Sequence, residues 1–358
     1  MPPIDEKIAE VEEEIKSTPY NKASQHHIGK LKAKLSTLRD QQLSIGKGRG
    51  AGKGYAVKKT GDATVVLVGF PSVGKSSILN ALTNAESKVA AYEFTTIDTV
   101  PGVMKYRGAT IQLLDVPGLV EGASRGKGRG KEVLSVIRGA DVVLMVTEAA
   151  KPEQIEKIKT EVYDGGIRLN KKPPDVQITR KAFGGISLST VRKLPFDLED
   201  VRNVMNEYGY HNAHVLIRGS LTFDELIDAA AGNRSYVPGI FVINKTDLAG
   251  HVKRIPDSVL VSATKKSGLD ELRAEIFRKL NFMRVYLKPQ GGKADYDEPL
   301  IVKRNAAVED VCRLLHKEFV KRFRYATVNG KSAKFENQKV GIRHRLEDGD
   351  VITVITKD

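Results

Sequence analysis

A glycine-rich loop that directly follows a short apolar segment constrains the fold more than any other feature. Residues 63–70 (ATVVLVGF) are apolar and β-branched, a pattern typical of a buried parallel strand. Residues 69–76 (GFPSVGKS) match G-x-x-x-x-G-K-[ST], and a helical stretch over 76–83 follows. Such a loop points successive N–H groups at phosphates, and the helix N-terminus adds positive potential. A glycine turn with an incidental lysine is the competing interpretation, which the strand–loop–helix order disfavours.

The loop therefore predicts a nucleotide phosphate site. Lys75 would reach the β- and γ-phosphates, and the Ser76 hydroxyl would bind Mg²⁺. We expect the phosphate contacts to come from Gly69, Pro71, Ser72, Val73, Gly74, Lys75, Ser76 and Ser77.

Two further motifs follow apolar segments downstream. Asp115-Val-Pro-Gly118 ends the apolar segment over 110–115, so Asp115 is expected to bind Mg²⁺ and the Gly118 N–H to meet the γ-phosphate. Asn244-Lys-Thr-Asp247 predicts the choice of base, because a carboxylate can accept from N1–H and N2–H₂ of guanine, whereas adenine presents wrong-sign partners. Lys245 would lie along the ring plane, and the Ala263 N–H would be offered to guanine O6. The expected guanine contacts are Asn244, Lys245, Asp247, Ser262, Ala263 and Thr264.

The segment between the loop and Asp115 contains a threonine pair. Thr96 is expected to close over Mg²⁺ in the triphosphate state, with Thr95 as its competitor and surface β-branched residues as the plain alternative. The metal ligands are then Ser76, Thr96 and Asp115, and the catalytic residues are Lys75, Thr96 and Gly118. The four elements, in this order, predict a guanine-nucleotide-binding domain.

One position departs from the Ras template, in which a glutamine after D-x-x-G orients the attacking water. Leu119 stands there, and an aliphatic side chain cannot orient water. Intrinsic hydrolysis is therefore expected to be slow unless another group or a partner positions the water. Arg125 and Arg129 are open to either interpretation, as catalytic contacts or as solvated charges.

The remaining pattern predicts the architecture. Strand-like segments alternate with helical stretches, which indicates an α/β domain with a mainly parallel sheet. About 70 residues within that domain are too long for a structureless loop, so we expect an inserted α+β subdomain. The expected divisions are a helical hairpin (1–44), a basic glycine-rich linker (45–60), a nucleotide-binding domain (61–283), its insertion (165–236) and a C-terminal α+β domain (284–358). In the last, one amphipathic helix is expected over 307–319, with Val308, Val311, Leu314 and Leu315 facing inward.

Composition limits the cellular setting. The single cysteine, Cys312, excludes an internal disulfide framework and fits a reducing compartment. The chain lacks an apolar stretch of about 18 residues, and its acidic N-terminus is unlike a secretory signal. We therefore expect a cytoplasmic protein without a membrane partner.

The quoted motifs resemble a known family. GFPSVGKSSILNALT, YEFTTIDTVPG and LLDVPGLVEGASRGKGRGKEVL are similar to Obg-related GTPases of the TRAFAC class. The whole chain resembles the developmentally regulated GTP-binding proteins (DRG), which implies a P-loop GTPase core and a C-terminal TGS domain with a ubiquitin-like grasp fold. The resemblance also implies Mg²⁺-dependent hydrolysis of GTP to GDP, association with ribosomes and translation, and a small regulatory partner protein. Many potassium-stimulated relatives carry asparagine where this chain has Ser72, so dependence on K⁺ stays open.

The net charge of +14 is unevenly distributed. Residues 21–60 carry a net charge of +9 and residues 283–358 carry +5, while the first 20 residues carry −4. Two basic regions flanking a nucleotide switch favour contact with a phosphate backbone, such as that of ribosomal RNA. The alternative is a GTP-gated protein-interaction module without direct RNA binding. In the C-terminal region, Lys317, Lys321, Arg322 and Arg324 interleave with Phe319, Phe323 and Tyr325, which suits RNA or a solvated helix with core aromatics equally.

Overall fold

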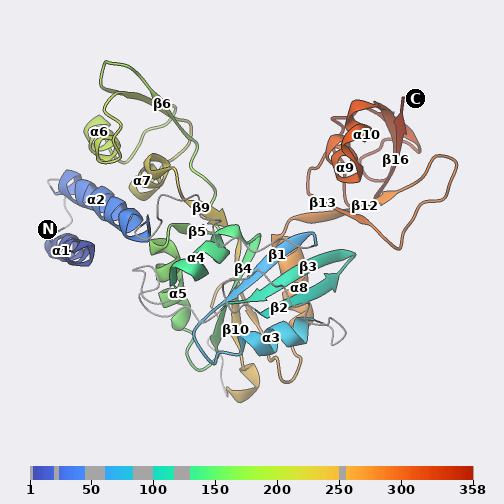
Figure 1. Cartoon of the computed structure of the whole chain (residues 1–358), viewed down its shortest axis with the longest axis horizontal. Helices are drawn as coiled ribbons and strands as arrows, with labels where there is room; N and C mark the ends of the chain where they lie inside the picture. Colours follow the sequence, from blue (N-terminus) through green and yellow to red (C-terminus); the bar gives the residue numbers. More distant parts are fainter. Residues whose placement is uncertain are drawn as a thin grey trace. The chain divides into compact units, whose positions relative to one another are not determined.

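The computed structural model describes residues 3–19, 24–44, 61–83, 100–116, 130–249 and 255–357 (Figure 1). The chain divides into two compact units. One contains Met1–Val57, Gly118–Gly139 and Glu153–Val237, and the other contains Lys58–Pro117, Ala140–Pro152 and Pro238–Asp358. The N-terminal helices therefore share a unit with the segment at 165–236.

A six-stranded sheet forms the centre of the second unit. Its order is β11-β10-β4-β1-β3-β2, and all neighbours are parallel except β2 and β3. The strands are β1 (Ala63–Val68), β2 (Val100–Tyr106), β3 (Ala109–Asp115), β4 (Val142–Glu148), β10 (Gly239–Asn244) and β11 (Ser258–Leu260). The residues of β1 are all buried, as expected for a central parallel strand. The predicted α/β core with a mainly parallel sheet is confirmed.

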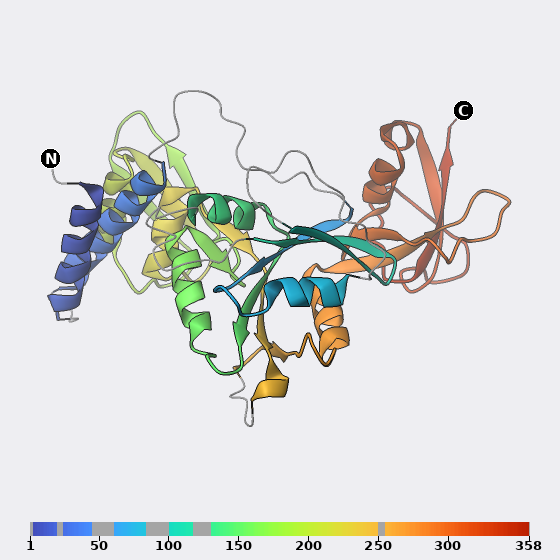
Figure 2. The ribbon, with the colours of Figure 1, turned by 60° about the horizontal axis from the view of Figure 1, so that its bottom comes forward.

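Helices α3 (Lys75–Leu82) and α8 (Leu269–Lys279) pack on this sheet, side by side in Figure 2. Ile78 and Leu82 of α3 and Leu272 and Ile276 of α8 are buried in the same apolar core as the strands. Because α3 begins where β1 and its loop end, packing of this helix fixes the direction of the loop's N–H groups.

The first unit begins with the predicted helical hairpin. Helices α1 (Ile4–Ser17) and α2 (Gln25–Ser44) pack through a small apolar cluster that includes Ile8, Val11 and Leu31. The rest of the unit contains α4 (Gly130–Gly139), α5 (Gln154–Asp164), β5 (Ile167–Leu169) and β9 (Ser235–Val237), with β5 and β9 parallel.

The remaining elements of this unit form an α+β layer pair. Strands β6 (Val176–Arg180), β7 (Ile186–Thr190) and β8 (Ala213–Ile217) make a sheet of order β6-β8-β7. Helices α6 (Leu198–Glu207) and α7 (Phe223–Ala231) each begin with a capping box, at Asp197 and Thr222. Ala33 of α2 joins their apolar core, so the hairpin packs on these helices.

The C-terminal part of the second unit is a five-stranded sheet of order β13-β12-β16-β14-β15. Its elements are β12 (Phe282–Leu287), β13 (Leu300–Lys303), α9 (Val308–Leu315), α10 (Lys317–Lys321), β14 (Phe323–Asn329), β15 (Gln338–Val340) and β16 (Asp350–Thr356). The prediction of a single helix over 307–319 was wrong, because His316 adopts an extended conformation (φ −172°, ψ 148°) between α9 and α10. The inward position expected for Leu314 was also wrong, since its side chain is 57% exposed.

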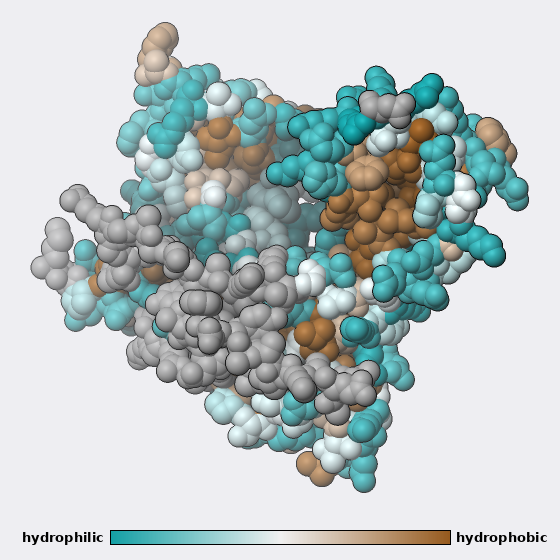
Figure 3. All heavy atoms as spheres, turned by 45° about the vertical axis from the view of Figure 1, so that its right-hand side comes forward, coloured by the Kyte–Doolittle hydropathy of each residue, from teal (hydrophilic) through white to brown (hydrophobic). Residues whose placement is uncertain are grey.

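The surface is mixed in character. On the face drawn in Figure 3, hydrophobic patches lie between hydrophilic side chains. None of the helices in the described ranges is long and apolar enough to cross a membrane.

Candidate functional site

The loop after β1 adopts the backbone conformation that its sequence predicts. Gly74 is left-handed (φ 89°) and caps α3, and Ser72 is also left-handed (φ 64°). A Cβ at Gly69 would lie 2.4 Å from the carbonyl oxygen of Val146, so the loop also approaches β4 too closely for a side chain there. Val73 is buried in the sheet core, which leaves its backbone as the part available to a ligand.

Lys75 folds back over this loop. Its Nζ donates to the carbonyl oxygens of Gly69 and Phe70, both at 3.2 Å. Burial lowers the pKa of Lys75, while the nearby carboxylate of Asp115 opposes that shift. The loop thus holds an ammonium group largely removed from water, which is suited to an anionic ligand.

Ser76 and Asp115 meet directly. The Ser76 hydroxyl donates to Oδ2 of Asp115 at 2.5 Å, joining the first turn of α3 to the end of β3. Register places Asp115 beside Leu67, near the carboxyl end of β1. A hydroxyl and a carboxylate are oxygen ligands of the type that Mg²⁺ prefers, so this pair fits the metal predicted there.

Asn244 connects the phosphate loop with the base-recognition segment. Its Nδ2 donates to the carbonyl oxygen of Val73 at 3.0 Å, and its Oδ1 accepts from the Ala263 N–H at 3.2 Å. A Cβ at Gly74 would lie 2.3 Å from the same Nδ2. The structure therefore brings together three motifs that are far apart in sequence. The Ala263 N–H, predicted for guanine O6, is engaged by Asn244 in this structure.

The carboxylate of Asp247 lies in the short helix η1 (Thr246–Leu248) after β10. Its Oδ1 accepts from the Ser262 hydroxyl at 2.5 Å, and Ser262 also accepts from the Lys265 N–H. This fixes one carboxylate oxygen and leaves further acceptor positions on the group. Asp247 is exposed, and so is the predicted contact Thr264 in the following turn.

Glu148 is part of this site but was missed by the sequence reasoning. It is paired in register with Asn244, and its Oε2 lies 2.9 Å from Nζ of Lys245. This hydrogen bond with Lys245 is the main reason that the pKa of Glu148 is lowered. A glutamate at the end of a buried strand next to the N-K-x-D strand was the available signal. It required knowing that β4 and β10 are neighbours.

Three predicted positions lie outside the described residues: Thr96, Gly118 and Leu119. The basic linker at 45–60 also lies outside them, and so do Thr95, Arg125 and Arg129. The proposed roles of these residues stay predictions.

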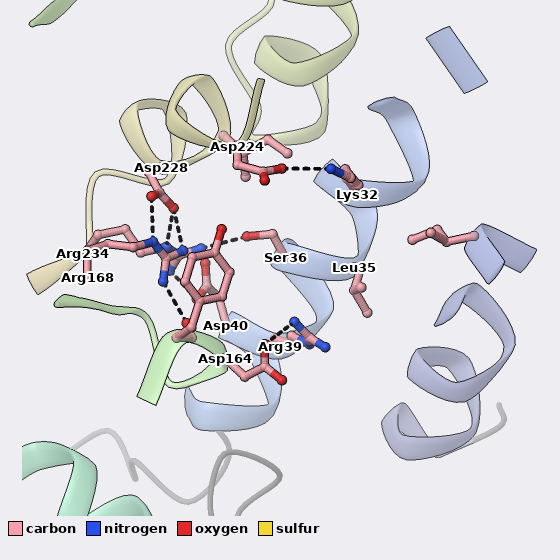
Figure 4. Close-up of a pocket in the computed structure, with 13 residues that line it drawn as sticks. Lys32, Leu35, Ser36, Arg39, Asp40, Asp164, Arg168, Asp224, Asp228 and Arg234 are labelled. Atoms are coloured by element: carbon pink, nitrogen blue, oxygen red, sulfur yellow. Dashed lines mark hydrogen bonds and ion pairs between the residues drawn. The ribbon is translucent and has the colours of Figure 1, made fainter. Parts of the chain in front are cut away.

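A cavity of about 220 Å³ lies in the first unit between α2, α7 and the segment after α5 (Figure 4). Arg168 donates to both oxygens of Asp228 at 2.6 Å, and its guanidinium lies 3.6 Å from the centre of the Tyr163 ring. Arg234 pairs with Asp40 of α2 at 2.6 Å. The buried arginines are paired with carboxylates, so the residues around this cavity connect the hairpin to the rest of the unit through a buried ion-pair network.

Comparison with known proteins identifies the family. The model described as "50S ribosome-binding GTPase" matches residues 64–181, that of the "C-terminal region of MMR_HSR1 domain" matches 183–282, and that of the "TGS domain" matches 283–356. The chain is 44% identical to developmentally-regulated GTP-binding protein 1 of Xenopus laevis, with 98% of each chain covered. It belongs to the developmentally regulated GTP-binding protein family.

A further relative is also similar over nearly its full length. An uncharacterized GTP-binding protein of Methanocaldococcus jannaschii is 53% identical, covering 99% of this chain and 93% of the relative. Among solved structures, the YchF GTPase of Schizosaccharomyces pombe has a TM-score of 0.47 at 15% identity, covering 83% of this chain and 99% of that chain. The protein is thus a GTP-binding member of the Obg-related DRG family with a C-terminal TGS domain.

Proposed function

We propose that this protein hydrolyses GTP to GDP and phosphate and acts as a ribosome-associated switch. The observation that carries the enzymatic part is the double hydrogen bond of Asn244, which ties the phosphate loop to the base-recognition turn. The loop N–H groups and Lys75 would bind the phosphates, and Asp247 would accept from the guanine edge. Lys245 would cover the ring plane.

Mg²⁺ would be held by Ser76 and Asp115, with Thr96 as the proposed third contribution. When bound, the ion neutralises charge on the β- and γ-phosphates. The Ser76 hydroxyl would give up its bond to Asp115 and turn a lone pair outward.

Hydrolysis is proposed to be slow in the isolated protein. Leu119 replaces the water-orienting glutamine of the Ras template, and the Gly118 N–H is proposed to meet the γ-phosphate. A partner that supplies the missing positioning would then act as the activator.

The ribosomal part is supported by charge and by the family description. Positive charge concentrates in 21–60 and 283–358, which suits binding to a phosphate backbone. The alternative is a GTP-gated module for a small partner protein without direct RNA contact. Salt-dependent co-sedimentation with ribosomes separates the two, since absence of binding at low salt with both GTP analogue and GDP contradicts the RNA part.

Base selection has its own test. We expect Asp247→Asn to shift binding from guanine towards xanthine nucleotides, because an amide can donate where the carboxylate accepted. The measurement is the ratio of GTP to xanthosine triphosphate affinity. Asp270→Asn is the matched control, since that side chain is 97% exposed at the start of α8. An unchanged ratio in Asp247→Asn would refute the assignment of the guanine site.

A further inference from the structure

The sheet of β6, β7 and β8 has one face that no described element of its unit covers. Alternate side chains, including Ile178, Leu188 and Val215, face α6 and α7 and join their apolar core. Successive strand residues point to opposite faces, so the residues between them form an outer face. Register places Thr179 beside His214 and His214 beside Ser187. This outer face consists of Gln177, Thr179, Ser187, Ser189, His214 and Leu216.

The outer face is rich in hydrogen-bonding groups. Nζ of Lys181 donates to the Ser187 hydroxyl at 2.9 Å, and that oxygen lies 3.1 Å from Nδ1 of His214. At one edge, Arg218 pairs with Asp175 at 3.1 Å and donates to Gln177 at 2.9 Å. With one apolar residue, Leu216, among these groups, the face is unlike an apolar docking surface.

Positively charged side chains lie within or next to β6 and β7 in the sequence. Residues 171–193 contain six basic residues and one acidic residue, a net charge of +5, whereas residues 194–236 carry −4. The six cations are exposed, and none forms an ion pair in the part of the chain that the structure describes. They are Lys171, Lys172, Arg180, Lys181, Arg192 and Lys193. Arg180 is in phase with Ile178 and so belongs to the opposite face, where its guanidinium lies 4.4 Å from the centre of the Tyr210 ring.

Three carboxylates of the acidic part of the same segment already have partners. Asp228 pairs with Arg168 and Arg234, Asp224 pairs with Lys32, and Asp200 is hydrogen-bonded to His26. Figure 4 shows two of these carboxylates on α7 directed at arginine and lysine side chains. These three carboxylates are therefore paired within the unit, whereas the exposed cations form no ion pair among the described residues.

We propose that the outer face of this sheet binds RNA through its phosphate backbone. Exposed cations complement phosphates, while hydroxyl, imidazole and amide groups suit sugar and phosphate oxygens. Phe183 is 84% exposed in the turn between β6 and β7, where it can stack on an unpaired base. This inference rests on the RNA-directed part of the proposed function and assigns it to a segment other than the two basic regions already named.

The test uses the full-length protein and a fluorescein-labelled RNA hairpin with a single-stranded loop. The test variant is Lys171→Glu/Lys172→Glu/Lys193→Glu, which reverses three exposed side chains with no ion pair in the described residues. The control is Lys16→Glu/Lys105→Glu/Arg202→Glu, an equal charge change at exposed positions elsewhere. Fluorescence anisotropy measures affinity across salt concentrations from about 50 to 200 mM. Thermal melting and GDP binding verify that both variants fold.

The test variant should bind RNA at least about tenfold more weakly, and the slope of log affinity against log salt should fall by about two to three. The control should lose much less. Equal losses in both variants would overturn this inference while leaving ribosome association through other regions intact. If the wild type binds no RNA, both RNA claims fail, but GTP binding and turnover, measured separately, still test the enzymatic claim.

Two further arms separate other partners. Phosphatidylserine vesicles and a poly-glutamate peptide replace the RNA in the same titration. Binding to either one that depends on the three lysines, without RNA binding, would overturn the proposal in favour of a membrane or an acidic protein. Phe183→Ala should weaken binding to the looped RNA several-fold but leave an RNA duplex unaffected, because stacking needs an unpaired base.

Discussion

At the residue scale, the nucleotide site depends on close approaches that exclude side chains. Asn244 occupies the space beside Gly74, with its Nδ2 only 2.3 Å from where a Cβ would be. The motif letters G-K-S and N-K-x-D could be read from the sequence without the structure. The contact between them could not, since it depends on the order of β10, β4 and β1 in the sheet.

Gly74→Ala should therefore impair nucleotide binding. The left-handed backbone (φ 89°) strains an alanine by about 1–3 kcal/mol, and its methyl group would displace Asn244. We expect at least about tenfold weaker GDP affinity, measured by titration with a fluorescent GDP analogue. Gly139→Ala is the control, because nothing lies within 4 Å of its added methyl group. Equal affinities for both variants and the wild type would contradict this account.

Glu148 is expected to position Lys245 over the base. Glu148→Gln removes the charge partner at 2.9 Å, so the lysine should become more mobile and GDP should dissociate about three to ten times faster. Stopped-flow release of a fluorescent GDP analogue measures this rate. Glu153→Gln changes an exposed glutamate five residues further along the chain and should have no effect. An unchanged rate in Glu148→Gln would show that the ion pair is incidental.

At the scale of elements, the sequence predicted the strands and helices better than their interruptions. Leu315 and Phe319 are four residues apart, so periodicity alone predicted one helix through both. The helix breaks at His316, whose ring nitrogen accepts from the Glu318 N–H to cap α10. Phe319 still packs on the domain core, but Leu314 is turned outward. Only tertiary packing reveals such a break.

The buried ion-pair network between the hairpin and α7 gives a prediction for the free energy of unfolding. Asp228→Ala leaves Arg168 and Arg234 without their shared carboxylate in a buried site and should cost about 3–5 kcal/mol. Asp224→Ala, on the same helix, removes a half-exposed pair with Lys32 and should cost about 0–1 kcal/mol. Urea unfolding measures both. Similar losses would show that the buried network is no stronger than the surface pair.

His26 predicts a pH dependence at the contact of α2 with α6. Its hydrogen bond with Asp200 raises the pKa of His26 above 6.5, with the charges of Asp200, Asp197 and Glu199 acting in the same direction. A pKa raised by folding means that the stabilisation is complete below about pH 6.5 and disappears as the pH rises through the folded value. The difference in Tm between wild type and His26→Gln should therefore shrink from pH 6 to pH 9. A constant difference would exclude this titration.

At the scale of the whole molecule, the distribution of charge along the chain was more informative than the net charge. The sequence predicted basic regions at 21–60 and 283–358, but the average over the inserted segment hid a polarity of +5 against −4. The strand register separates the two faces of the β6-β8-β7 sheet. The ion pairs of the hairpin show which carboxylates of this segment already have a partner. Motifs in the sequence were enough to predict the family and the α/β core. The uncovered face of the β6-β8-β7 sheet could be identified only from the structure.

We propose that this protein is a ribosome-associated GTP switch, and that the ribosome is the partner that supplies the missing positioning of water. The most direct measurement is the steady-state GTP hydrolysis rate of the full-length protein with and without purified ribosomes, each in K⁺ and in Na⁺. We predict slow turnover alone, because Leu119 cannot orient water, and an increase of at least about tenfold when ribosomes are added. Lys75→Ala should abolish both rates. A fast rate without ribosomes, or a rate that ribosomes leave unchanged in both salts, would contradict the account.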